Sequence, residues 1–115
     1  MHQKLYNLEL IHLMSGQDQA FVQKMVRLFL ELMPGLLERL KKGIDEENYS
    51  EIKLTAHKMI SSIEMVGIEL IKPVVRSIEK MAAEKNDIQE IKVTFDYMEN
   101  IIQKVIQQIE EELTG

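Results

Sequence analysis

The chain of 115 residues contains three histidines, and one of them, His57, is placed where it could do chemistry. Apolar residues recur around it every three or four positions: Ile52, Ala56, Met59, Ile63 and Val66. At about 100° per residue these five lie within roughly 40° of one direction of a helix, and His57 lies about 130° away from it. We therefore expect His57 to face the solvent, where a neutral imidazole is a nucleophile near neutral pH.

A phosphoryl group on an imidazole nitrogen stays transferable, and the neighbours of His57 suit such a group. Lys53, one turn earlier, and Lys58, the next residue, could screen its negative charge. Ser61, one turn later, offers a small hydroxyl beside the ring. The alternative interpretation, an ordinary exposed helical histidine, stays open on these residues alone.

Two apolar residues, Leu54 and Met65, fall on the same outward face as His57. Exposed apolar side chains beside a reactive group indicate a docking surface for another protein, although single surface apolar residues are also common. The other histidines, His2 and His12, have no second ligand at the i, i+4 spacing that metal sites use, and we expect no metal site.

Length and composition exclude several classes of protein. We expect one domain over residues 1–115, because domains of this size are common. The net charge of -5 and the lack of a basic stripe argue against a nucleic-acid partner. No apolar run approaches the roughly 20 residues of a membrane span, and the N-terminus has no signal-peptide core. With no cysteine, these features predict a cytoplasmic protein.

The periodicity predicts a short N-terminal helix and four longer ones. The first lies in residues 5–14, and Ser15 with Asp18 then forms a plausible N-cap for the next. That helix runs to Lys42, with a kink or short break at Pro34. Its predicted apolar stripe is Phe21, Met25, Leu28, Leu32, Leu36 and Leu40.

The remaining helices follow after a turn at residues 43–47. Asn48 and Glu51 form a capping box before the His57 helix, and Gly67 is a natural stop after it. A further helix spans about residues 69–85, and Asp87 caps the last helix. The last helix carries the regular seam Ile88, Ile91, Phe95, Met98, Ile102, Val105 and Ile109. The predicted fold is all-α, an up-down-up-down antiparallel four-helix bundle with a short N-terminal helix.

The spacing around His57 resembles that of a known family, the histidine-containing phosphotransfer (HPt) domains of bacterial multistep phosphorelays. The family centre reads His-x-Leu-Lys-Gly-Ser, then Gly ten residues after the histidine, then an apolar residue with Glu or Gln at twenty-one and twenty-two. At those offsets this chain has His57, Met59, Ser62, Gly67, Ile78 and Glu79. Upstream, residues 16–21 and 28–34 are similar to the family's Gly-Asp-x-x-Phe and Leu-Phe-Leu…Pro runs. The resemblance covers nearly the whole chain.

This resemblance implies a function for His57. It would accept a phosphoryl group from a receiver-domain aspartate, usually on Nε2, and pass it to a second receiver domain. The partners would be response-regulator receivers, possibly of a hybrid histidine kinase, and Mg²⁺ would sit on the receiver only. Glu79 belongs to the matching positions and is counted among the supporting residues; we expect it to hydrogen bond within the bundle near His57, without a catalytic role. The chain would act as a monomer without a cofactor of its own.

Two positions depart from the family pattern. Ile60 stands where the family has Lys, and Ser61 stands where it has Gly. The missing Lys should weaken the electrostatic support of phosphohistidine unless Lys58 or Lys53 replaces it.

Two other functions stay open on the sequence. One is a helical interaction module that binds a receiver or kinase domain without carrying phosphate. The other is a structural bundle that self-associates through the seam of the last helix. No Gly-rich phosphate loop is present, so we expect no ATP-dependent kinase activity, and whether the chain is an enzyme is left open.

Overall fold

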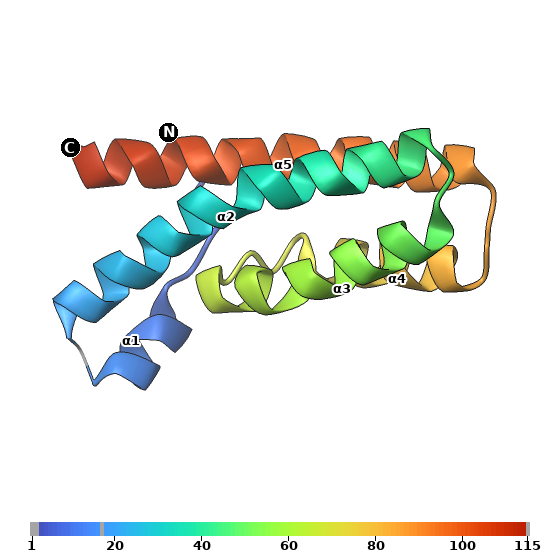
Figure 1. Cartoon of the computed structure of the whole chain (residues 1–115). Helices are drawn as coiled ribbons and strands as arrows, with labels where there is room; N and C mark the ends of the chain where they lie inside the picture. Colours follow the sequence, from blue (N-terminus) through green and yellow to red (C-terminus); the bar gives the residue numbers. More distant parts are fainter. Residues whose placement is uncertain (1–2, 17, 115) are drawn as a thin grey trace.

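Helices and short turns make up nearly all of the computed structural model, which describes residues 3–16 and 18–114 (Figure 1). In these residues the helices are α1 (Glu9–Ser15), α2 (Gln19–Asp45), α3 (Tyr49–Val66), α4 (Lys72–Ala83) and α5 (Ile88–Thr114). Helices α2 to α5 alternate in direction, each packs against the next, and α2 also packs against α5 (Figure 1). Helix α1 packs against α2 and α3. The predicted up-down-up-down bundle with a short N-terminal helix is confirmed.

The predicted apolar stripe of α3 is the central part of the core. Ile52, Ala56, Met59, Ile63 and Val66 are all fully buried, as predicted. The seam of α5 is also buried from Ile91 to Ile109, and only Ile88 at its start is partly exposed. Large aliphatic side chains therefore fill the interior, and burial of each contributes about 1.5–3 kcal/mol to folding.

The predicted apolar stripe of α2 is wrong by one position. The residues that α2 buries are Val22, Val26, Phe29, Met33, Leu37, Leu40, Gly43 and Ile44. Leu28 and Leu32, expected in the core, are 42% and 50% exposed. Two apolar stripes run side by side along this helix, about 100° apart. The structure buries one of them. Of the other, Leu28 and Leu32 lie at the surface, whereas Phe21, Met25 and Leu36 are partly buried against the core.

Pro34 lies inside α2 and does not break it. Figure 1 shows the helix changing direction about halfway along, as expected where proline removes one backbone hydrogen bond. The helix ends at Asp45, three residues later than predicted, because Gly43 is a packing residue and not a stop. A Cβ atom on Gly43 would lie 3.2 Å from Cγ1 of Ile52, so the glycine lets α3 approach α2 closely.

The ends of α3 lie where the sequence places them, but only half of the predicted capping box forms, because the Glu51 carboxylate accepts from Arg39 and the Asn48 N–H donates to the Gly43 carbonyl. The Asn48 side chain accepts a hydrogen bond from the backbone N–H of Glu51 at 3.1 Å. Gly67 ends the helix with φ +66°, a left-handed conformation that suits glycine. A Cβ atom on Gly67 would also overlap the backbone carbonyl of Asn7, whose N–H donates to the Val66 carbonyl at 3.0 Å. This close contact joins the N-terminal segment to the end of α3.

The N-terminal ends of α2 and α4 differ from expectation. Asp18 alone caps α2, with its carboxylate accepting from the N–H groups of Ala20 and Phe21, while Ser15 is the last residue of α1. Helix α4 begins at Lys72 and not near residue 69, because the preceding residues form a turn that buries Ile68 and Ile71. Its proline, Pro73, lies in the first turn as predicted.

Candidate functional site

His57 projects from α3 into the solvent, as predicted, and its side chain is 71% exposed. Its Nδ1 atom lies 2.6 Å from Oε2 of Glu79, a residue of α4 whose side chain is only 25% exposed. Because a carboxylate can only accept, the proton of a neutral imidazole belongs on Nδ1. Among the described residues, no hydrogen bond involves Nε2. That nitrogen therefore keeps its lone pair and faces incoming reactants.

The core fixes the two backbones that hold this pair. His57 lies between Ala56 and Met59 of the buried α3 stripe, and Glu79 follows Ile78, which is fully buried in α4. Neighbouring residues of a helix point about 100° apart, so a buried Ile78 places Glu79 at the border between core and solvent. The bundle thus presents the imidazole ring in one orientation without burying it.

The other predicted supporting residues form no hydrogen bond with His57 in the part of the chain that the structure describes. These residues, Lys53, Lys58 and Ser61, are all exposed. Together with Arg39, the charge of Lys58 instead helps to lower the pKa of the Glu51 carboxyl. A hydrogen bond from Arg39 holds the pKa of the Glu51 carboxyl below its ordinary value of 4.5, and the charges of Arg39 and Lys58 add to this effect.

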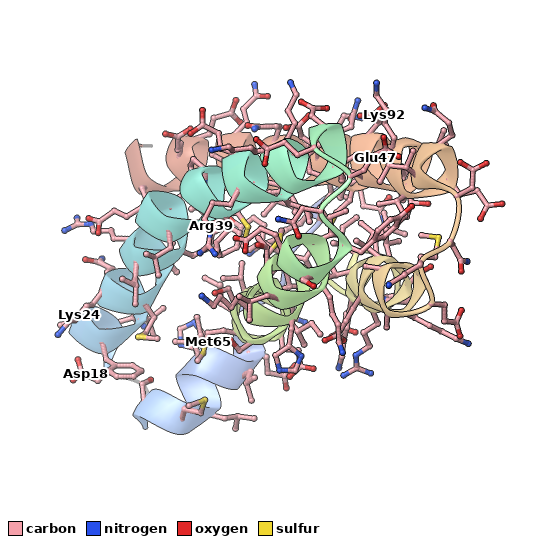
Figure 2. The ribbon with its side chains drawn as sticks, turned by 45° about the vertical axis from the view of Figure 1, so that its right-hand side comes forward. Asp18, Lys24, Arg39, Glu47, Met65 and Lys92 are labelled. Atoms are coloured by element: carbon pink, nitrogen blue, oxygen red, sulfur yellow. The ribbon has the colours of Figure 1, made fainter. Side chains whose placement is uncertain are left out.

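The two predicted docking residues lie on the α2 side of α3. Leu54 is 47% exposed, as expected, whereas Met65 is half-buried, which corrects its predicted outward position. Figure 2 shows Met65 on the side of α3 that is turned toward α2. There it lines a shallow groove of about 170 Å³ between the two helices. The groove is lined by Met25, Leu28, Phe29, Leu32, Ser61, Ser62, Met65 and Val66.

Sequence reasoning missed the α2 wall of this groove. The sequence predicts Leu28 and Leu32 in the core, yet they form an exposed apolar surface. Ser61, which lines the same groove, lies one turn after His57 on α3. The signal that could have found them is the pair of adjacent apolar stripes on α2. A helix that is apolar over more than one face has more apolar surface than the core can bury.

A second missed feature is a cluster of charges between α3 and α4. Glu64 Oε1 lies 3.0 Å from a guanidinium nitrogen of Arg76 and 3.5 Å from Nζ of Lys72. Lys72, Arg76 and Glu79 recur at i, i+4 and i+7, so they form one stripe along α4. This stripe faces the side of α3 that carries His57 and Glu64.

Metal ligands do not cluster in the described residues, where no three His, Asp or Glu side chains could hold an ion together. In the same residues, no helix is both long enough and apolar enough to span a bilayer.

The fold and the site together define a helical bundle that presents one oriented nucleophilic imidazole to the solvent. The family model described as Hpt domain matches residues 24–113, so the chain belongs to the Hpt domain family, as the sequence resemblance predicted. Hpt domains are phosphotransfer carriers in phosphorelays and interact with receiver domains.

A solved structure supports the same fold. The chain is similar to the HPt domain of an Hpt sensor hybrid histidine kinase from Shewanella, with a TM-score of 0.82. The match covers 96% of this chain and 95% of that chain at 14% sequence identity. No curated protein matches the sequence.

Proposed function

We propose that this Hpt domain accepts a phosphoryl group on Nε2 of His57 from the phosphoaspartate of one receiver domain and passes it to the aspartate of another. The observation that carries this proposal is the contact between Nδ1 of His57 and Glu79, at 2.6 Å, on a ring that is otherwise open to solvent. It leaves one unprotonated nitrogen, in a fixed orientation, for an incoming phosphoryl group.

The transfer follows from this arrangement. The Nε2 lone pair attacks phosphorus, the N–P bond forms, and the bond from phosphorus to the aspartate oxygen breaks with the electron pair going to the carboxylate. The Nδ1 proton stays between His57 and Glu79, and the Glu79 carboxylate stabilises the positive charge that the ring gains. The second transfer is the reverse of the first. We assign Mg²⁺ to the receiver and no cofactor to this chain.

A receiver must cover His57 to transfer the group in line, and the surface beside His57 suits such a partner. Leu54 lies one turn before it on α3, and the groove lined by Leu28, Leu32 and Met65 begins one turn after it at Ser61. These apolar side chains would lose water contact on docking, while the polar rim would set the orientation. We propose this α2–α3 face as the receiver-docking surface.

Transfer from a receiver tests the proposal. A receiver domain of a hybrid histidine kinase is charged with labelled acetyl phosphate and Mg²⁺, freed of excess reagent and mixed with this protein. We expect the label to move to the wild type and then to a second receiver, and not to His57→Gln. Tight binding without transfer of the label would contradict the carrier and support the interaction module.

Docking variants separate the surface from the chemistry. Leu54→Asp is expected to slow transfer from the receiver and to leave phosphorylation by the small donor phosphoramidate unchanged. Val93→Asp is the matched control, because Val93 is an apolar residue of α5 that is 68% exposed. Equal transfer rates for these two variants would contradict the α2–α3 docking surface.

The monomeric state and the cytoplasmic location stay predictions. Light scattering is expected to give the mass of one chain, 13.4 kDa. A dimer mass would favour a self-associating bundle, although not through the α5 seam, which is buried within one chain.

A further inference from the structure

Two polar contacts join α3 to α4, with an uncharged position between them. At one point along the two helices the Glu79 carboxylate contacts Nδ1 of His57. Farther along, the Glu64 carboxylate contacts Arg76 and Lys72. His57 and Glu64 are seven residues apart, so they point in nearly the same direction, about 10.5 Å apart along the helix. Between them α3 has Ile60, which is partly buried against the core and carries no charge.

The phosphoryl group on His57 would place roughly two negative charges between α3 and α4, beside the carboxylate of Glu79. Helix α3 provides little to balance them on this side. Ile60 is apolar, Lys58 points about 100° away from His57, and Lys53 lies one turn in the opposite direction. A cation of α4 that faces this side would therefore add to the support that α3 gives only through Lys53.

Arg76 is the residue of α4 placed for this role. It precedes Glu79 by three residues, about 4.5 Å along the helix, so its backbone lies between the levels of His57 and Glu64. Its side chain is 57% exposed and can move. Its ion pair with Glu64 is also exposed and therefore weak. Lys72 contacts the same carboxylate oxygen, so Glu64 keeps a partner when Arg76 leaves.

We propose that Arg76 moves from Glu64 to the phosphoryl oxygens of phosphorylated His57 and binds them through its guanidinium group. This inference rests on the proposed function of His57 and adds a phosphoryl-binding residue to it. A guanidinium group donates two parallel hydrogen bonds to a phosphate, which suits a group that must be held and then released. Arg76 forms no covalent bond, and the proton on Nδ1 stays with Glu79.

Phosphoramidate kinetics test Arg76 without a protein partner. The rate of phosphorylation and the half-life of the phosphorylated protein at neutral pH are measured by intact mass for the wild type, Arg76→Ala and Arg76→Lys. Lys92→Ala is the matched control, because it removes one exposed cation from α5 and gives the same change in net charge. Thermal melts of each variant check that the bundle is folded.

We expect Arg76→Ala to lower the rate and shorten the half-life about threefold to fivefold, the size of an exposed charge pair. Arg76→Lys should recover part of both, and Lys92→Ala should change neither. A second readout is the guanidinium NMR signal of Arg76, which should shift on phosphorylation of the wild type.

Two failures are distinguishable. A wild type that takes up phosphate, with Arg76→Ala equal to Lys92→Ala in rate and half-life, would overturn the assignment of Arg76 alone. A wild type that takes up no phosphate, while a known carrier does, would overturn both this assignment and the proposed function.

Discussion

Replacing Glu79 by alanine is expected to slow phosphorylation of His57 by phosphoramidate about tenfold, a free-energy difference of about 1.4 kcal/mol. Glu79 is the acceptor for Nδ1 of His57 at 2.6 Å, and this contact selects the tautomer whose Nε2 is free. Without it the proton is free to occupy either nitrogen, the ring can turn, and the positive charge that develops during transfer loses its neighbour.

The size of the effect follows from the exposure of the pair. A hydrogen bond to a charged group contributes about 1.5–3 kcal/mol. The side chain of His57 is 71% exposed and that of Glu79 is 25% exposed, so water weakens the contact and the lower end of this range applies. Glu79→Gln keeps an acceptor oxygen for Nδ1 and loses the charge, so its rate should fall between those of the wild type and Glu79→Ala.

The assay is the rate of phosphoryl uptake by intact mass under a fixed excess of phosphoramidate. Asp96→Ala is the control, because it removes one exposed carboxylate of α5 and gives the same change in net charge. NMR of the product should show more phosphoryl on Nδ1 in Glu79→Ala than in the wild type. Equal rates for Glu79→Ala and Asp96→Ala would refute the role assigned to Glu79.

Three further predictions concern the bundle. Gly67→Ala should lower the free energy of unfolding by about 2 kcal/mol or more, because Gly67 has φ +66° and faces the Asn7 carbonyl; an unchanged urea midpoint would contradict this. Met33→Ala should lower the free energy of unfolding in urea by about 2–5 kcal/mol, because Met33 is fully buried. Leu32→Ala should lower it by less than about 1 kcal/mol, because Leu32 is half exposed. The reverse order would support the stripe predicted from the sequence. The depressed pKa of Glu51 means that its carboxylate contributes stability above pH 4.5 and that this contribution is lost as the pH falls through the folded-state pKa. The urea midpoints of the wild type and Glu51→Gln should therefore differ at neutral pH and converge in acid, and a difference that persists in acid would count against the Arg39–Glu51 contact.

The orientation of His57 was predictable because α3 has one clear apolar stripe. The five apolar residues spaced three or four apart lie on one side, so the direction of the core and the exposure of His57 follow from periodicity alone. The ends of α3 were predictable for a similar reason, since Asn48 and Gly67 act within one turn of the helix.

The register of α2 was not predictable in this way. Leu28 and Leu32 form as regular a stripe as Phe29 and Met33, and the local pattern does not rank them. Packing against both α3 and α5 decides which stripe is buried. The result matters for function, because the stripe left outside forms the wall of the proposed docking surface.

The partners of the site depend on the register between two helices. The spacing singled out Glu79 as a position near His57, but its contact with Nδ1 is set by how α3 packs against α4. The contact between Arg76 and Glu64 has the same origin and leaves no local pattern in the sequence. Side-chain pairs between helices therefore need the structure, whereas the face of one helix does not.

The central claim, that His57 is the phosphoryl acceptor, is tested most directly by intact mass after treatment with phosphoramidate, at neutral pH and after acid. We expect one acid-labile phosphoryl group on the wild type and none on a folded His57→Gln protein. No addition to the wild type, under conditions that phosphorylate a known carrier, or an addition that persists in His57→Gln, would contradict this claim.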